Sequence, residues 1–234
     1  EMMLDLLFRG ASVVDGSGES ARQIDVGVKD GRITLDVAGK TAKETVDATG
    51  LTLCPGFIDP HSHGDMSIGM DFGAICKISQ GVTTEITGQC GSSPFPALPE
   101  RLSPDEPWKC VSFADFVQKF EAENHRMATN QAMLVGHGSL RAAAVGLEDR
   151  LAAPQEIKKM QALLARELEA GAWGMSLGLE YSPGFFAGKD ELHALAKTAA
   201  AYGGLVPCHI VVREVHRLPV FGFEFLFIIL QFGK

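Results

Sequence analysis

The chain has 234 residues, of which 46% are hydrophobic and 21% are charged, so it can bury a substantial core. Its formal net charge is -8 at pH 7 and it contains no run of Lys or Arg, which gives no support for nucleic-acid binding, because such binding needs a basic face. The five cysteines include no Cys-x-x-Cys pair, so the sequence indicates neither a disulfide framework nor a zinc ribbon.

The amino-terminal residues 1–54 are predicted to form short strands joined by tight turns. Residues 24–28 alternate in polarity and lead to Asp30-Gly31, which is a hairpin signal. The letters DGSG at residues 15–18 are also typical of a turn. We therefore expect this segment to be a small β-domain.

Two histidines follow within residues 55–65, which read PGFIDPHSHGD. Phe57 and Ile58 predict a short strand, and His61 and His63 lie two residues apart at its carboxyl end. Because side chains alternate along a strand, this spacing puts both imidazoles on the same side of the chain. Two imidazoles that converge on one point are what a divalent metal needs.

From Cys54 onward, predicted strands alternate with predicted helices, as in parallel β/α units. Ser112 is the expected N-cap of the second helix. The expected strands are residues 57–61, 81–87, 133–135, 172–177 and 205–210, and the expected helices are residues 71–79, 113–126, 154–170 and 190–202.

Cys90 follows the second predicted strand and precedes Gly91. A cysteine inside an apolar strand is usually a small buried residue, whereas one at a strand end beside glycines can reach the same face as His61 and His63. A thiolate is also a strong zinc donor. The position of Cys90 therefore makes it a candidate to share that face with the two histidines, and a small buried residue is the alternative.

Three stretches resemble the amidohydrolase superfamily, and the second and third of them resemble its N-acyl-D-amino-acid deacylase (D-aminoacylase) branch. They are PGFIDPHSH at residues 55–63, TGQCGSSP at residues 87–94 and EAGAWGMSLGLEYSPG at residues 169–184. The resemblance covers roughly residues 3–214 and only the amino-terminal part of a family member. It implies an α/β fold of the (β/α)8 TIM-barrel type, here about its first five strands over residues 55–214, beside the amino-terminal part of a β-sandwich over residues 1–54.

The resemblance also implies a metal-dependent hydrolysis. One or two zinc ions would be held by His61, His63, Cys90 and His209, the last of which lies in the fifth predicted strand. Zinc-bound water would attack the amide carbonyl of a small N-acyl-D-amino acid, with an aspartate after strand eight as general base. No residue of this chain matches that aspartate, so the isolated chain is expected to be incomplete and inactive.

Two further residues are candidates for the substrate site. Tyr181 lies in the loop after the fourth predicted strand and is either a substrate contact or a packing aromatic. His137 follows the third predicted strand and either lines the substrate site or makes a structural hydrogen bond. The sequence leaves both choices open.

The last stretch, residues 215–234, does not match the family. It is apolar, aromatic and almost without charge, which indicates an aggregation hazard if it is exposed. Glu224 interrupts it, and it falls short of the roughly 20 apolar residues that a membrane span needs. We expect a truncation or frameshift near residues 208–214, no membrane association and, because the amino terminus does not read as a signal sequence, a cytoplasmic location.

Two alternatives stay open at this point. The first is a cyclic-amide hydrolase of the dihydroorotase or hydantoinase type, against which Cys90 and the 169–184 block argue. The second is a non-catalytic fragment that at most binds metal or a partner. A half barrel would also leave its first and fifth strands with unpaired edges, so self-association through these edges is expected.

Overall fold

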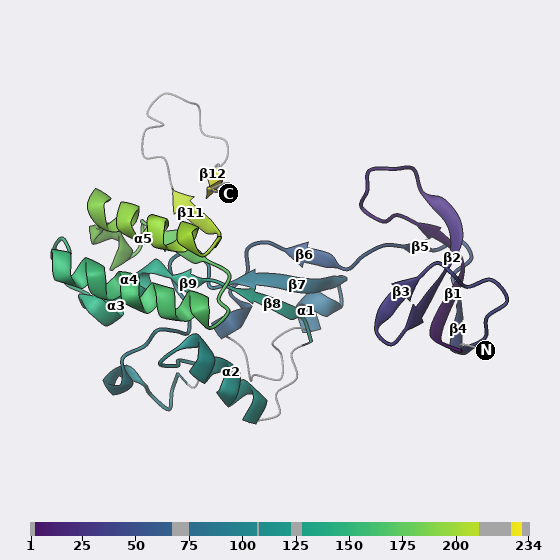
Figure 1. The fold of residues 1–234 in the computed structure, drawn as a ribbon, viewed down its shortest axis with the longest axis horizontal. Coiled ribbons are helices and arrows are strands. Elements are labelled where there is room, and N and C mark those ends of the chain that lie inside the picture. Colours follow the sequence, from purple (N-terminus) through teal and green to yellow (C-terminus); the bar gives the residue numbers. More distant parts are fainter. Residues whose placement is uncertain (1–2, 67–74, 107, 123–127, 211–225, 231–234) are drawn as a thin grey trace. The chain divides into compact units, whose positions relative to one another are not determined.

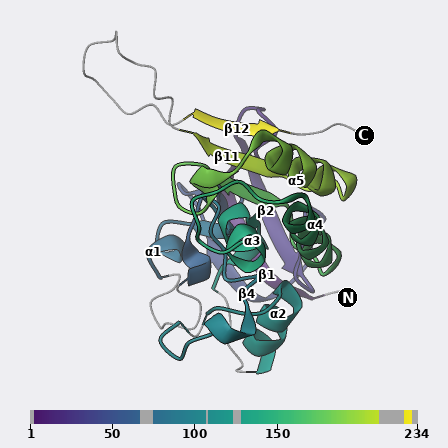
Figure 2. The same ribbon diagram turned by 90° about the vertical axis from the view of Figure 1, so that its left-hand side faces the viewer.

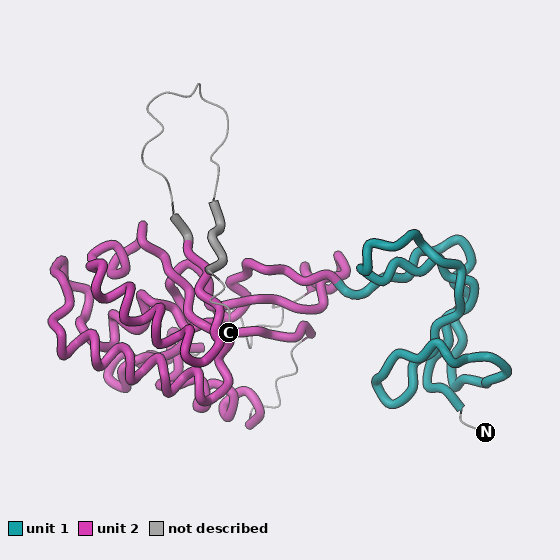
Figure 3. The backbone as a smooth tube through the Cα atoms, turned by 45° about the horizontal axis from the view of Figure 1, so that its top comes forward, with its two compact units in different colours: residues 1–56 teal, residues 57–234 magenta. Residues whose placement is uncertain are grey.

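The computed structural model describes residues 3–66, 75–106, 108–122, 128–210 and 226–230. The chain divides into two compact units, Glu1–Gly56 and Phe57–Lys234, which Figure 3 shows in different colours. This division falls two residues after the end of the predicted β-domain.

Unit 1 is built on one five-stranded sheet, whose strands are β1 (Leu4–Val13), β2 (Arg22–Lys29), β3 (Arg32–Thr34), β4 (Ala42–Asp47) and β5 (Thr52–Leu53). The strand β1 pairs antiparallel with β2 and parallel with β4 and β5. The turn from β2 to β3 contains Asp30 and Gly31, whose φ angles of 49° and 73° are those of a tight hairpin, so the predicted hairpin is confirmed. The described residues of this unit form a single sheet, and the predicted sandwich stays a prediction.

Unit 2 alternates strands and helices along the chain. Its strands are β6 (Phe57–Asp59), β7 (Val82–Thr87), β8 (Asn130–Met133), β9 (Val135–Gly136), β10 (Met175–Gly178), β11 (Val206–Ile210) and β12 (Leu226–Leu230). Its α-helices are α1 (Ile75–Ile78), α2 (Phe113–Ala122), α3 (His137–Ala144), α4 (Pro154–Glu169) and α5 (Lys189–Ala201). Three single-turn 3-10 helices are η1 (Gly64–Met66), η2 (Pro99–Arg101) and η3 (Gly184–Phe186).

The strands of unit 2 follow one another in chain order. One sheet has the order β6-β7-β8 and the other has the order β12-β11-β10-β9. Only Leu134 separates β8 from β9; its N–H donates to the Thr87 carbonyl (2.9 Å), and the Val135 N–H donates to the Gly174 carbonyl (2.9 Å). All pairings from β6 to β11 are parallel, so the predicted parallel β/α units are confirmed. The described strands do not close into a barrel.

Most predicted helices occur near their predicted positions. The N–H of Asp115 donates to the Ser112 side chain (3.1 Å), so the predicted N-cap of α2 is confirmed. Parts of two predicted helices, residues 71–74 and 123–126, lie outside the described residues. The helix α3 was not predicted. Glycines flank His137 on both sides, and glycine favours a turn over a helix.

The strand β12 lies in the tail that did not match the family. It pairs antiparallel with β11, with Cys208 opposite Ile228. The expectation of an open edge on the fifth strand was therefore wrong, because β12 covers that edge. The strand β6, in contrast, pairs only with β7 among the described strands. The expected truncation point, near residues 208–214, falls mostly outside the described residues.

The main core of unit 2 lies between its helices and the strands β9 to β11. The helix α4 packs against α3 and α5 (Figures 1 and 2). Fully buried apolar side chains from each layer meet there, among them Phe95, Met160, Leu164, Met175 and Leu195. Each such side chain contributes roughly 1.5–3 kcal/mol through its burial. In the described part of the chain, no helix is long and apolar enough to cross a membrane.

Candidate metal centre

Three of the predicted site residues come together at the carboxyl ends of two neighbouring strands. His61 and His63 follow β6, and Cys90 follows β7, which is parallel to β6 and paired with it. One ring nitrogen of each histidine and the sulfur of Cys90 all lie within 4.8 Å of one another. Cys90 Sγ is 3.2 Å from His61 Nε2, and the two imidazole rings have centroids 5.6 Å apart.

This arrangement fits the geometry of a zinc site. Zinc binds imidazole nitrogen at about 2.0–2.1 Å and thiolate sulfur at about 2.3 Å, so neighbouring atoms of a tetrahedral site lie about 3.5 Å apart. The 3.2 Å separation of Cys90 Sγ and His61 Nε2 is close to that value. Burial raises the pKa of the Cys90 thiol, so the thiol releases a proton when it binds a metal. Two imidazoles and one thiol are donors that suit zinc.

Hydrogen bonds fix the turn that carries the two histidines. The N–H of His61 donates to Asp59 Oδ1 (3.0 Å), and Asp59 also forms an ion pair with Lys77 of α1. The hydroxyl of Ser62 donates to the buried carboxylate of Glu85 on β7. The turn after β6 is thus attached to both α1 and β7, which holds its two imidazoles in place.

Gln89 attaches the Cys90 loop to the same turn. Gln89 is 3% exposed, and its side-chain amide donates to the Pro60 carbonyl (3.0 Å) and to the Ile86 carbonyl (3.3 Å). The hydrogen bond from Gln89 to Pro60 therefore links the loop that carries the thiol to the turn that carries the imidazoles. Sequence analysis missed this role, because nothing local marks a Gln whose partner is 29 residues away.

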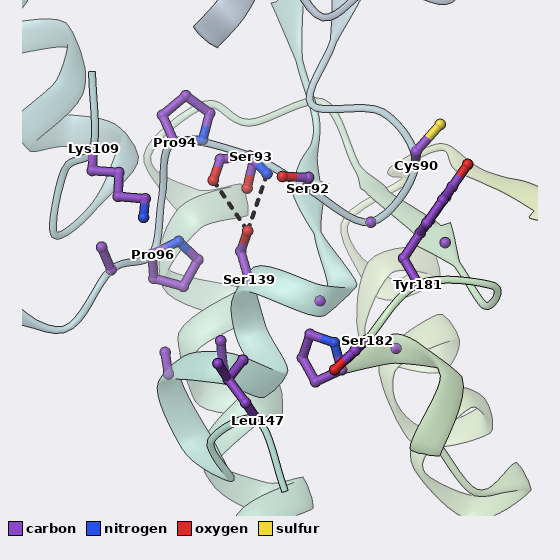
Figure 4. Close-up of a pocket in the computed structure, with 18 of the residues that line it drawn as sticks. Cys90, Ser92, Ser93, Pro94, Pro96, Lys109, Ser139, Leu147, Tyr181 and Ser182 are labelled. Carbon is purple, nitrogen blue, oxygen red and sulfur yellow. Dashed lines mark hydrogen bonds between the residues drawn. The ribbon is translucent and has the colours of Figure 1, made fainter. Parts of the chain in front are cut away.

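A cavity of about 690 Å³ opens beside the cluster. His63 and Cys90 line it together with Tyr181. Figure 4 shows Cys90 and Tyr181 on one side of this cavity and Lys109 on the other, with Ser139 between them. The groups that could hold a metal are thus part of the wall of a space large enough for a small molecule.

The cavity has a positive character that the whole chain does not have. Arg101 and Lys109 line it, and its described lining residues include no Asp or Glu, although the chain has 29 acidic residues and 21 basic ones. Lys109 also pairs with Glu106 at 2.6 Å, whereas Arg101 is exposed at the end of η2. These two cations were not singled out from the sequence.

The other predicted residues have three different placements. Tyr181 is 50% exposed and lines the cavity, which suits a substrate contact. His137 is completely buried, is hydrogen-bonded through Nε2 to the Glu191 carboxylate (2.8 Å) and is not among the cavity-lining residues, so its placement favours the structural role. His209 pairs through its backbone with Gly178 at the end of β10, and its side chain lies outside the described part.

The strand order and the cluster together define a class of protein. Parallel strand–helix units carry imidazole, thiol and a cavity at the carboxyl ends of their strands, which is where α/β enzymes keep their active sites. The class is that of α/β proteins with a candidate metal centre at the carboxyl ends of their strands.

Comparison with known proteins gives the family. The model of the family described as "Amidohydrolase family" matches residues 44–210, and the chain belongs to that family. The N-acyl-D-glutamate deacylase of Alcaligenes xylosoxydans xylosoxydans is 42% identical over 219 residues, which are 88% of this chain and 44% of that protein. The D-aminoacylase of the same organism is 36% identical over 215 residues, with the same coverage of 88% and 44%.

A solved structure agrees with these relatives. It is the N-acyl-D-glutamate deacylase of Bordetella bronchiseptica, complexed with zinc and a phosphonate inhibitor that mimics the tetrahedral intermediate. It superposes with a TM-score of 0.82 at 36% sequence identity, covering 89% of this chain and 45% of that one. This chain therefore spans less than half the length of the relatives that it matches.

Proposed function

We propose that this chain is the amino-terminal part of a zinc-dependent hydrolase that cleaves the amide C–N bond of N-acyl-D-amino acids. The observation that carries the proposal is the cluster of His61, His63 and Cys90 at the ends of β6 and β7, beside the cavity. Two relatives that are 42% and 36% identical to the chain are an N-acyl-D-glutamate deacylase and a D-aminoacylase, and a similar N-acyl-D-glutamate deacylase was solved with zinc.

The proposal assigns His61, His63, Cys90 and His209 to one or two zinc ions. Zinc at this site would supply Lewis-acid polarisation of the amide carbonyl and activation of water. The chain's own part is to place imidazole and thiolate donors at one point and to hold them there through Asp59, Glu85 and Gln89. The described lining of the cavity offers no carboxylate, so we assign no general base in this part of the chain.

The architecture belongs to the same proposal. The parallel strands β6 to β11 would be the first five strands of a TIM-type barrel over residues 55–214, with β8 and β9 as its third strand. The sheet of residues 1–54 would be the amino-terminal part of a β-sandwich. We propose a cytoplasmic location, and the five cysteines, which form no disulfide among the described residues, suit its reducing conditions.

The cavity favours a substrate with a second negative charge. We propose that Tyr181 contacts the substrate and that Arg101 and Lys109 attract an anionic group. Low-dielectric walls of one sign concentrate ligands of the opposite sign, even on a chain whose net charge is -8. N-acyl-D-glutamate and N-acyl-D-aspartate are therefore the substrates to test first.

The test measures zinc per chain and amine release from a panel of N-acetyl-D-amino acids. We expect bound zinc that is lost in Cys90→Ala, and we expect turnover of N-acetyl-D-glutamate above N-acetyl-D-glutamine, which has the same shape without the charge. N-acetyl-L-glutamate is the matched control for handedness. Because the chain spans less than half of its relatives, turnover is measured both in this chain and in the chain extended to the length of a relative.

Two outcomes would favour the alternatives. Turnover of dihydroorotate or a hydantoin, with none of the N-acyl compounds, would identify a cyclic-amide hydrolase. Zinc binding that requires Cys90, with no turnover in either length of chain, would indicate a metal-binding protein that is not a catalyst. Zinc content unchanged by Cys90→Ala would contradict the proposed centre itself.

A further inference from the structure

The loop that carries Cys90 has an unusual backbone. Cys90 has a φ of +54°, and it is one of two non-glycine residues with positive φ in the described chain. Gly88 and Gly91 on either side have φ values of +72° and +73°. Positive φ is unfavourable for a residue with a Cβ, so the surrounding structure must hold Cys90 in this conformation.

Ser176 of β10 makes the hydrogen bonds that span this loop. Its hydroxyl donates to the Gly88 carbonyl and accepts from the Gly91 N–H at 3.0 Å. One side chain, 1% exposed, thus connects the residues two before and one after Cys90. The hydroxyl donates one of these hydrogen bonds and accepts the other, so its removal would take a partner from two buried backbone groups, the Gly88 carbonyl and the Gly91 N–H.

The loop also lies directly on the backbone of β10. A Cβ added to Gly178 would be 1.9 Å from the Cys90 carbonyl oxygen, and a Cβ added to Gly91 would be 2.8 Å from the Gly178 nitrogen. No side chain fits between the loop and the strand at these positions. The loop is therefore pressed against β10 at the strand end, and Ser176 provides its polar attachment there.

We propose that Ser176 is a positioning residue for the thiolate of Cys90. By bridging Gly88 and Gly91, its hydroxyl keeps Cys90 in the left-handed conformation that aims Sγ at His61 and His63. The inference rests on the proposed function, in which Cys90 is a metal ligand. Gln89 attaches the same loop to the histidine turn independently. Loss of the Ser176 hydroxyl therefore makes the orientation of the thiolate less fixed, while the loop stays attached to the turn.

The experiment uses cobalt(II) as the probe, because a thiolate that binds cobalt gives a sulfur-to-metal charge-transfer absorption. The purified chain, Ser176→Ala and Ser176→Thr are titrated with cobalt in the metal-free state, with Cys90→Ala to identify the band. Met175→Ala is the matched control, since it truncates a completely buried side chain of the same strand and leaves the hydroxyl in place.

We expect Ser176→Ala to lower cobalt affinity by about 10–100-fold, as loss of groups that orient metal ligands does, and to weaken the band per bound cobalt. Ser176→Thr keeps the hydroxyl and should stay within about threefold of the parent. Met175→Ala should lower the melting temperature while its band per bound cobalt stays that of the parent.

If Ser176→Ala binds cobalt with the affinity and the absorption band of the parent, the positioning role of Ser176 is wrong, and the metal role of Cys90 is not affected. Equal losses in Ser176→Ala and Ser176→Thr would also overturn it, because packing rather than the hydroxyl would then matter. A parent band that Cys90→Ala does not change would contradict the metal role of Cys90, and with it both the proposed function and this inference.

Discussion

Asp65 lies two residues after His63 and is completely buried in η1. Neither of its carboxylate oxygens makes a hydrogen bond of normal geometry with the described residues. Burial raises its pKa from the ordinary value of 3.8 to about 6, although the nearby backbone N–H groups of Gly88 and Asp65 act to lower it, and the Glu85 carboxylate adds a smaller upward shift. A carboxylate in such a place destabilises the fold at neutral pH, because ionisation costs more in the folded state than in the unfolded one.

Asp65→Asn is therefore expected to stabilise the metal-free protein near neutral pH. A pKa raised in the folded state means that stability is full below the unfolded pKa of 3.8 and is lost as pH rises toward about 6. A pKa shift of about two units corresponds to at most about 3 kcal/mol in the free energy of unfolding. Urea unfolding of parent and variant at pH 4 and pH 7, with a chelator, measures the difference.

The variant should be more stable than the parent at pH 7, and the two should converge at pH 4. Asp59→Asn is the control of opposite sign. Although burial acts to raise its pKa, the hydrogen bonds from Lys77 and the His61 N–H hold the pKa of Asp59 below its ordinary value, so its loss should reduce stability at pH 7. Equal stability of Asp65→Asn and the parent at pH 7 would contradict the argument.

Local pattern explains which residues of the site could be predicted. His61 and His63 are predictable because the period of a strand puts them together, and Cys90 because it follows the neighbouring parallel strand. Gln89 and Ser176 act through backbone groups that are 29 and 85 or more residues away, and no local pattern marks such pairs. Their roles depend on the close approach of loop and strand, which only the folded backbone shows.

At the scale of elements, a buried polar network joins α3 to α5. Glu191 of α5 accepts from Arg141 and pairs with His137 Nε2 at 2.8 Å, and all three side chains are at most 1% exposed. Desolvation acts to raise the pKa of Glu191, but the hydrogen bond with His137 and the charge of Arg141 hold it below its ordinary value. The ion pair thus keeps a carboxylate charged inside the core.

Glu191→Leu is expected to lower the free energy of unfolding by about 3–5 kcal/mol, because it leaves the buried Arg141 without its partner charge. The double variant Glu191→Leu with Arg141→Met should lose less than the sum of the single changes, since it removes both charges. Chemical denaturation of the four proteins measures the coupling. Additive losses would show that the pair does not act as a unit.

The helix α3 also shows why element prediction failed at one place. Its sequence, HGSLRAAA, begins with a histidine between two glycines, and local propensity there favours a turn. The burial of Arg141 and His137 against Glu191, about 50 residues later, outweighs this preference. The long helix α4 was predictable because its apolar stripe and Pro154 agree with its tertiary position.

At the scale of the whole molecule, the two ends of the parallel strand series differ. The edge of β11 is covered by β12, whereas β6 has no partner beyond β7 among the described strands. Phe57 and Ile58 on β6 are 57% and 63% exposed, and Ile75 of the adjoining α1 is 69% exposed. An apolar edge strand with free backbone groups is a template for pairing with another chain.

We therefore expect this chain to self-associate through β6 and Ile58→Lys to reduce the association. A lysine on an edge strand adds charge that must be desolvated when two edges pair, and like charges then face each other across the contact. Sedimentation velocity over a range of protein concentrations measures the shift toward monomer. Leu151→Lys is the matched control, because Leu151 is similarly exposed (68%) but lies in the segment between α3 and α4, outside every described strand. A concentration-dependent sedimentation coefficient that Ile58→Lys leaves unchanged would place the contact elsewhere on the molecule.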